Sequence, residues 1–303
     1  MKLALKIDVD TCVGTELGVP ALASLCERLG VSATFLCSLG PDHTGRALRR
    51  IFRPGFLSKV KRTSVLEHYG VKTLLYGVLL PGPDIGRRCA PILRTVRDQG
   101  FEVGVHTWDH VLWQDFVTTR GPQWTATQMR LACERFQEVF GSAPRVHGAA
   151  GWQMNAHAFA LEDGLGFSYA SDCRGHGPFL PSVDGRTLRC TQLPTTLPTL
   201  DELIGRPDLG TRTPVDHLLG LTRPDESRGG ARDHVFTLHA ELEGRRLAPW
   251  LEQLIRGWMS QGYEITSLAA YHSALDRTAL PVRHITYGGV EGRSGTLALE
   301  GQD

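Results

Sequence analysis

Hydrophobic positions along the chain follow two periodicities, one typical of strands and one typical of helices. Short apolar runs predict buried strands at residues 3–9, 33–37, 101–105, 145–147, 167–170, 188–193 and 234–239. Apolar positions three or four residues apart predict helices at residues 17–29, 92–99, 125–140 and 249–259. Because strands and helices alternate, the chain is predicted to adopt an α/β fold with a largely parallel sheet.

Two further predictions concern the ends of elements. Thr125 and Gln128 have the spacing of a capping box, so the third helix is expected to begin there. The segment beyond Arg277 is rich in glycine and polar residues. We therefore expect residues 278–303 to form a loosely ordered tail behind a single domain of residues 1–277.

Residues 42–84 depart from this pattern because they are both basic and apolar. Between Asp42 and Asp84, eight basic residues accompany one acidic residue, Glu67. We interpret this segment as an insertion after the second strand, and its composition suits contact with an anionic membrane surface, where apolar burial and charge attraction add. A helical excursion whose apolar face packs on the core would show the same pattern.

Composition and charge narrow the classes of protein that this chain can be. Its 303 residues, 41% of them hydrophobic, can bury a sizeable core. Lys and Arg number 33 against 32 Asp and Glu, so we expect no nucleic-acid partner. The seven cysteines are widely spaced without a Cys-x-x-Cys pair, which predicts reduced thiols. The chain enters a strand directly and its longest apolar run is 74–80, so neither a signal peptide nor a transmembrane helix is expected.

Polar residues that could carry chemistry follow the first and third predicted strands. Asp8 and Asp10 end the first strand, and residues i and i+2 of a strand point to the same side, so both carboxylates can face one site. His106 and His110 follow the third strand at a spacing that places two imidazoles on one helical face, where they can hold one metal ion. Each pair alone also has a structural explanation, such as Asp10 capping the next helix.

A third histidine closes the strand at 234–239. His239 is a candidate general acid, because imidazole titrates near neutral pH. Glu241 lies two residues on and is expected to orient it. The other histidines, such as His43 and His272, are interpreted as surface residues. Four tryptophans near the candidate site in sequence could wall a pocket or simply pack: Trp108, Trp113, Trp124 and Trp152.

Together, Asp8 and Asp10, the His106-x-x-x-His110 pair and Leu238-His239 resemble the motifs of the polysaccharide deacetylase family, in the same order and over most of the chain. The resemblance implies an irregular (β/α) barrel of about seven parallel strands. It also implies that Asp8 is the catalytic base and His239 the acid. Asp10, His106 and His110 would then bind a divalent metal ion, with zinc, cobalt, nickel and manganese all suited to these ligands.

Further motifs narrow the resemblance to one branch of that family. These motifs are Gly40-Pro41-Asp42, Ala149-Ala150-Gly151-Trp152, Ser171-Asp172-Cys173-Arg174-Gly175 and His239-Ala240-Glu241. The branch removes an N-formyl group from an amino sugar on undecaprenyl phosphate, a step of lipid A modification and of resistance to cationic antimicrobial peptides. The implied partners are a lipid-linked amino-sugar substrate and the cytoplasmic face of the bacterial inner membrane, bound peripherally, with no obligate protein partner.

One segment departs from the family pattern. The arginine that pairs with the base in the family's Arg-x-Pro-x-Gly segment would fall at His147, and only Gly151 of that segment remains. We therefore expect Arg174 to supply the guanidinium that holds Asp8. The other candidate supporting or substrate-binding residues are Asp172, Trp152, Glu241 and Trp108.

Three other functions remain open at this point. An N-deacetylase of another N-acyl sugar, of the peptidoglycan or polysaccharide type, would use all of these catalytic residues. Two histidines with one carboxylate also suit a non-haem iron oxygenase. A sugar-binding relative without activity is the third alternative.

Overall fold

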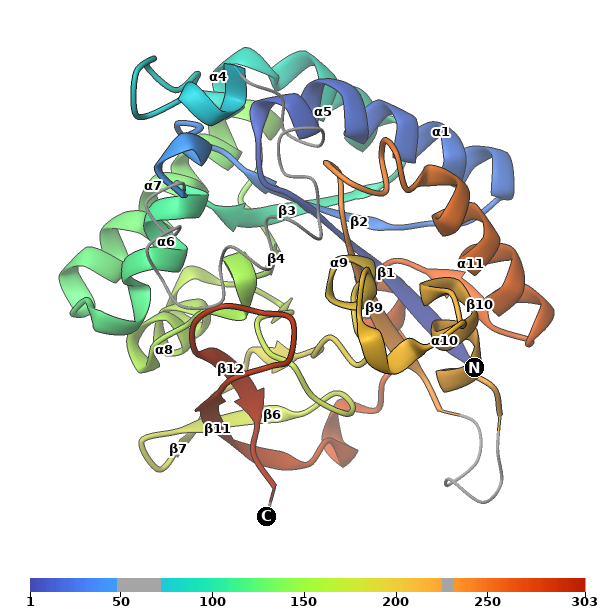
Figure 1. The fold of residues 1–303 in the computed structure, drawn as a ribbon. Helices are drawn as coiled ribbons and strands as arrows, with labels where there is room; N and C mark the ends of the chain where they lie inside the picture. The colour runs from blue at the N-terminus through green and yellow to red at the C-terminus, as the bar shows by residue number, and fades with distance from the viewer. Residues whose placement is uncertain (48–71, 225–231, 303) are drawn as a thin grey trace.

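A parallel sheet of eight strands forms the centre of the computed structural model, which describes residues 1–47, 72–224 and 232–302 (Figure 1). The strands are β1 (Lys2–Val9), β2 (Thr34–Ser38), β3 (Glu102–Thr107), β4 (Val146–His147), β5 (Tyr169–Ala170), β8 (Thr191–Gln192), β9 (His234–His239) and β10 (Glu264–Thr266). They lie in the order β10-β1-β2-β3-β4-β5-β8, and β9 pairs with β1. The predicted parallel α/β sheet is confirmed.

The sheet curves into an irregular barrel. Beyond β8, the backbone N–H of Thr196 donates to the carbonyl of Val235 on β9 at 3.1 Å, which brings the β8 end of the sheet against the strand that pairs with β1. The eighth strand, β10, pairs with only the first residues of β1, from Lys2 to Ala4. The barrel implied by the family resemblance is therefore present, with β10 as an added strand.

Helices cover the outside of this barrel. They are α1 (Val19–Leu29), α4 (Ile85–Arg88), α5 (Ala90–Asp98), α6 (His110–Phe116), α7 (Pro122–Phe140), α8 (Ala156–Leu165), α9 (Leu200–Leu203), α10 (Pro214–Leu221), α11 (Ala248–Ser260) and α12 (Leu268–Ser273). The four predicted helices correspond to α1, α5, α7 and α11. The predicted capping box at Thr125 is wrong: α7 begins at Pro122, whose fixed φ and missing N–H suit a first helical position.

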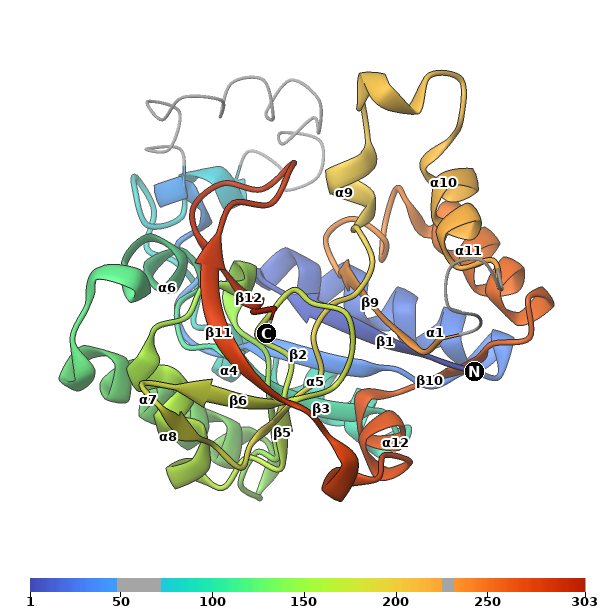
Figure 2. The same ribbon diagram turned by 90° about the horizontal axis from the view of Figure 1, so that it is seen from below.

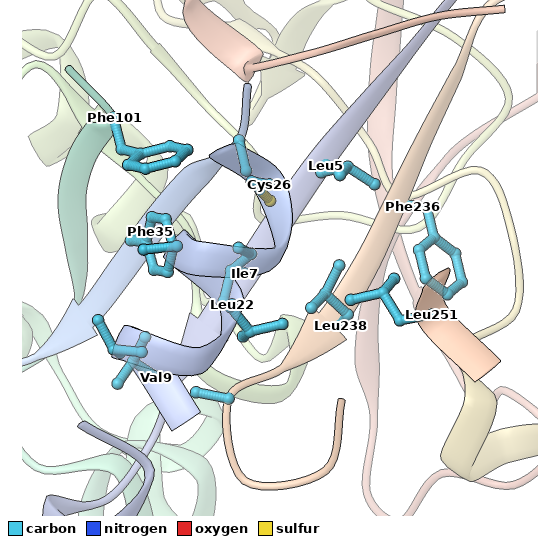
Figure 3. Close-up of a cluster of buried hydrophobic side chains, with 14 of the residues drawn as sticks. Leu5, Ile7, Val9, Leu22, Cys26, Phe35, Phe101, Phe236, Leu238 and Leu251 are labelled. Carbon is cyan, nitrogen blue, oxygen red and sulfur yellow. The ribbon is translucent and has the colours of Figure 1, made fainter. Parts of the chain in front are cut away.

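The largest hydrophobic core lies between the sheet and these helices. Leu5, Ile7 and Val9 on β1 point into it and meet Leu22 of α1 and residues of β9 and α11 (Figure 3). Because side chains alternate along a strand, the intervening polar positions of β1 point to the opposite face, into the barrel. The alternation of apolar and polar residues along β1 therefore places its apolar side chains in the core and its polar side chains together inside the barrel.

A second, smaller sheet contains the C-terminal residues. Its strands are β6 (Leu180–Val183), β7 (Arg186–Thr187), β11 (Val282–Gly288) and β12 (Leu297–Glu300), in the order β12-β11-β6-β7. The backbone of Arg174 also exchanges hydrogen bonds with Ala298 and Glu300, at 3.0 and 2.9 Å. The expectation of a loosely ordered tail is therefore wrong, because strand pairing with residues about 100 positions earlier orders this segment.

Two predictions about composition can be compared with the described residues. All seven cysteines are free thiols, as predicted. Among the described residues, every helix is too short or too polar to span a lipid bilayer. Most of the predicted insertion at 42–84 falls on residues 48–71, which lie outside the described residues.

Candidate active site

The three predicted metal ligands converge where β1 and β3 end. Asp10 follows β1, His106 lies in β3, and His110 begins α6. The Nε2 atoms of His106 and His110 lie 3.2 and 3.3 Å from Asp10 Oδ1. The carboxyl ends of parallel strands are the usual position of active sites in α/β barrels.

This arrangement fits a divalent metal ion. Asp10 Oδ1 is buried without a hydrogen-bond donor among the described residues. Burial alone would raise the pKa of Asp10, but His110 and His106 beside it hold that pKa well below its usual range, as a carboxylate ligand requires. The Nδ1 atom of His106 lies 2.6 Å from the carbonyl of Gly148, which leaves Nε2 for the metal.

The candidate base Asp8 is paired with a lysine. Asp8 Oδ2 lies 3.5 Å from Lys6 Nζ, and both side chains are buried. Lys6 also donates to the carbonyl of Ser171 at 2.9 Å. The expectation that Arg174 holds Asp8 is therefore wrong: Arg174 donates instead to Glu202 Oε1 at 2.6 Å. The missed signal was a lysine inside an apolar strand, two residues before Asp8 and so on the same strand face.

The candidate acid His239 lies beside Asp8. It is the last residue of β9 and is directly opposite Asp8 in the strand register. Its backbone N–H donates to Glu243 Oε2 at 2.8 Å. Its Nδ1 atom is buried without a hydrogen-bond partner among the described residues. The pairing of β9 with β1 thus brings the candidate base and acid together across more than 200 residues of sequence.

Glu241 does not orient His239 as predicted. Its Oε1 accepts hydrogen bonds from the backbone N–H groups of Asp10 and Thr11, at 3.1 and 2.9 Å, and from the Thr11 hydroxyl. The strand β9 ends at His239, so the two side chains do not share a strand face. Burial and the negative charge of Asp10 raise the pKa of Glu241 well above its usual range. Glu241 supports the site by fixing the turn that carries Asp10.

Asp172 lies in a buried polar cluster with His147 and Gln192. Its Oδ1 accepts from the backbone N–H of Ala149 at 2.7 Å and lies 2.9 Å from His147 Nδ1. Desolvation lowers the pKa of His147, but Asp172 and Glu162 outweigh it and raise that pKa to about 10. Gln192 donates to both carboxylates, at 2.9 and 3.1 Å, so the cluster is internally satisfied.

The four tryptophans that lie near the candidate site in sequence are in different parts of the structure. Trp152 lies next to Lys6, with the ring centroid 5.2 Å from Nζ, and its indole N–H donates to Thr195 at 2.9 Å. Trp108 stacks under Arg135, and its carbonyl accepts from the N–H of Gly40. Trp113 and Trp124 stack on each other in a separate core cluster. Of the four, Trp152 is the one in contact with the residues around Asp8.

The interpretation of His43 as a surface residue is wrong. Its Nδ1 lies 2.6 Å from Asp109 Oδ2, and its side chain is 17% exposed. Asp109 caps α6 by accepting the N–H of Leu112 at 3.0 Å. Since His110 is the first residue of α6, His43 supports the helix that carries a candidate ligand. Its proximity to Asp109 depends on tertiary structure and has no local sequence signal.

Solved structures share this fold. A "putative polysaccharide deacetylase" from Mycobacterium smegmatis superposes with a TM-score of 0.63 at 18% identity, covering 95% of this chain and 94% of that one. A crystal structure named Puue allantoinase gives a TM-score of 0.57 at 13% identity, with 90% of each chain covered. No family model matches the sequence. The two structural matches show that the chain has the fold of the polysaccharide deacetylases.

Curated relatives identify the family within this class. A protein of Shewanella sediminis named "Probable 4-deoxy-4-formamido-L-arabinose-phosphoundecaprenol deformylase ArnD" is 33% identical over 299 residues, 98% of this chain and 94% of its own. A protein of the same name from Wigglesworthia glossinidia brevipalpis is 27% identical over 293 residues, 95% of this chain and 98% of its own. The chain belongs to this deformylase family, which confirms the resemblance drawn from its motifs.

Proposed function

We propose that this protein removes the N-formyl group from 4-deoxy-4-formamido-L-arabinose carried on undecaprenyl phosphate, giving formate and the free amino sugar. The observation that carries the proposal is the position of Asp8 and His239, opposite each other in the register of β1 and β9. Beside them, Asp10, His106 and His110 form a ligand set. The relatives, which match nearly the whole chain, support the choice of substrate.

The residues divide the chemistry between them. A divalent metal ion bound by Asp10, His106 and His110 would polarise the formyl carbonyl and acidify a water molecule. Asp8 accepts the proton of that water as the new C–O bond forms, and Lys6 balances the charge of the Asp8 carboxylate. His239 donates a proton to the sugar nitrogen as the C–N bond breaks, because an unprotonated amide nitrogen is a poor leaving group. The products are formate and the amine.

Formate release tests this proposal. The purified, metal-reconstituted protein is given formamido-arabinose phosphate on a short polyprenyl chain, with Asp8→Ala and His106→Ala alongside. Formate from the wild type alone supports the proposal. If the protein releases acetate from N-acetyl sugars but no formate, the amide-hydrolysis mechanism stands and the proposed substrate is rejected. Neither product from metal-loaded protein would reject the hydrolase assignment.

Peripheral binding to the inner membrane is the second part of the proposal. The basic and apolar composition of residues 42–84 supports it, as does an exposed apolar turn in the described part of that segment. Val78, Leu79 and Leu80 are 51%, 76% and 38% exposed. Apolar side chains beside basic residues suit insertion into an anionic lipid surface.

Flotation with vesicles tests the membrane contact. We expect the wild type to float with vesicles that contain anionic phospholipid and to be released by high salt or detergent. Leu79→Asn should weaken flotation. Met259→Gln, which removes a similarly exposed apolar side chain (46%) from α11, should not. Wild-type protein that stays in solution with every vesicle composition would contradict this part.

A further inference from the structure

The C-terminal hairpin reaches the candidate active site. Figure 2 shows the loop between β11 and β12 extending toward α9. Arg293, in this loop, has a side chain only 11% exposed. Its Nε donates to Glu202 Oε1 at 2.6 Å and its Nη2 donates to Asp201 Oδ1 at 2.7 Å. A residue from the predicted tail is thus buried in an ion-pair network near the catalytic residues.

The geometry of the loop is specific. Gly292 and Gly295 both have positive φ, 84° and 86°. A Cβ atom at Gly295 would lie 2.3 Å from Gln153 Nε2, and one at Gly292 would lie 3.2 Å from the Cα of Glu202. Both positive φ values favour glycine, and the backbone of Glu202 leaves little room for a Cβ at Gly292. The loop is therefore shaped to bring Arg293 to α9.

Three cations surround the ring of Trp152. Its centroid lies 4.7 Å from Arg293 Cζ, 4.9 Å from Arg174 Cζ and 5.2 Å from Lys6 Nζ. Trp152 itself has φ of 55°, an unfavourable conformation for a bulky residue that persists when surrounding contacts fix it. The cations and the hydrogen bond to Thr195 supply those contacts.

Glu202 holds the two arginines together. Its Oε1 accepts from Arg174 Nη1 and Arg293 Nε, each at 2.6 Å. Burial raises the pKa of Glu202, but Arg293 and Arg174 outweigh it and lower that pKa. The carboxylate offsets the repulsion between the guanidinium groups, which would otherwise separate over one ring. Without Arg293, less positive charge would offset the carboxylates of Asp201 and Glu202. The Trp152 ring would also lose one of its three cation contacts.

We infer that Arg293 is a positioning residue of the active site, which holds Trp152 against Lys6 and thereby Lys6 against Asp8. The contacts run from Arg293 to the Trp152 ring, from that ring to Lys6 Nζ, and from Lys6 Nζ to Asp8 Oδ2. Arg293 acts through these residues, and through the direct attraction between its charge and that of Asp8, rather than on the substrate. Only the expected effect of Arg293 on turnover rests on the proposed function; its expected effect on Trp152 does not.

Hydrogen exchange of the Trp152 indole N–H tests the structural half of this inference. The protein is labelled with ¹⁵N-tryptophan, and Trp152→Phe assigns the signal. We expect Arg293→Met to accelerate exchange of this N–H at least about tenfold, because the ring loses a fixed neighbour. Arg283→Met is the matched control: Arg283 pairs with Glu300 in the same small sheet, at 3.7 Å. Unchanged exchange in Arg293→Met would overturn the inference.

Turnover tests the functional half. We expect Arg293→Met to lower kcat at least about tenfold with little change in KM or cobalt affinity, because a misplaced catalytic group slows the chemical step. Arg293→Lys should recover part of kcat, since it keeps the charge but not the forked geometry. Unchanged kcat, or a loss explained by unfolded protein, would overturn the inference. If the wild type releases no formate, the proposed function fails, and exchange at Trp152 still decides the inference.

Discussion

A single lysine inside an apolar strand determines how the candidate base is held. Lys6 is fully buried, and burying an isolated ammonium group is costly unless it is paired and hydrogen-bonded. Asp8 and the carbonyl of Ser171 provide that pairing. The usual family arginine position carries His147, which instead joins Asp172 and Glu162. The cation beside the base therefore comes from β1 itself.

Replacing Lys6 tests this role. We expect Lys6→Met to lower kcat by about 10²-fold, the lower range for impaired general base catalysis, because Asp8 loses its compensating charge. Lys6→Arg should keep more activity. The measurement is kcat for formate release at saturating metal, with the folded fraction checked by circular dichroism. Equal activity of Lys6→Met and wild type would contradict the role.

A second single residue, Glu243, predicts how the stability of the protein depends on pH. Burial raises its pKa from 4.5 to about 8, while the hydrogen bond from the His239 N–H acts in the opposite direction. The native protein therefore holds a proton that the unfolded chain releases, so stability falls as pH rises from about 4.5 to about 8. Glu243→Gln should flatten this decline in the free energy of unfolding, measured with urea across the window. Parallel curves for both proteins would contradict the assignment.

At the scale of elements, the turn after β1 depends on close packing between segments distant in sequence. Glu241 accepts the N–H groups of Asp10 and Thr11, and Gly14 leaves room for its carboxylate. A Cβ at Gly14 would lie 1.9 Å from Glu241 Oε1. The glycine therefore allows Glu241 to fix the backbone of a candidate metal ligand.

Gly14→Ala should disturb both stability and metal binding. We expect a loss of about 1–3 kcal/mol in the free energy of unfolding, typical of overpacking, together with weaker cobalt binding. Gly164→Ala is the control, since nothing lies within 4 Å of its added Cβ and it is in α8. That substitution should leave metal affinity unchanged and raise stability by up to about 1 kcal/mol. Identical metal affinities for both variants would contradict the role of this turn.

Elements with strong local patterns could be predicted from the sequence, and elements formed by distant pairing could not. The runs at 3–9 and 234–239 predicted β1 and β9 closely, because buried parallel strands are continuously apolar. By contrast, β11 alternates between exposed and half-buried residues, and its order comes from β6 and β12. Arg293 was missed for the same reason: its partners lie about 90 residues away.

At the scale of the whole molecule, the candidate metal site joins separate parts of the barrel. Asp10 follows β1, whereas His106 and His110 lie almost 100 residues later. The unfolded chain cannot present these three ligands together, so a metal ion should bind the native state preferentially. Metal binding is therefore expected to stabilise the entire fold.

Thermal unfolding measures this coupling. At a metal concentration of 100 times Kd, we expect about 2.7 kcal/mol of stabilisation and a rise of several degrees in Tm. Asp10→Asn should abolish the rise. Asp8→Asn should retain it, because Asp8 is assigned to the base rather than to the ligand set. A rise of equal size in Asp10→Asn would place the metal elsewhere.

Formate release by metal-stripped and metal-restored protein tests the central claim most directly. The stripped wild type should release no formate from formamido-arabinose phosphate on a short polyprenyl chain, and one equivalent of divalent metal should restore release. Asp8→Asn should bind that metal with wild-type affinity and still release no formate. Formate from fully stripped protein, or wild-type rates from metal-loaded Asp8→Asn, would contradict a metal-dependent deformylase with Asp8 as its base.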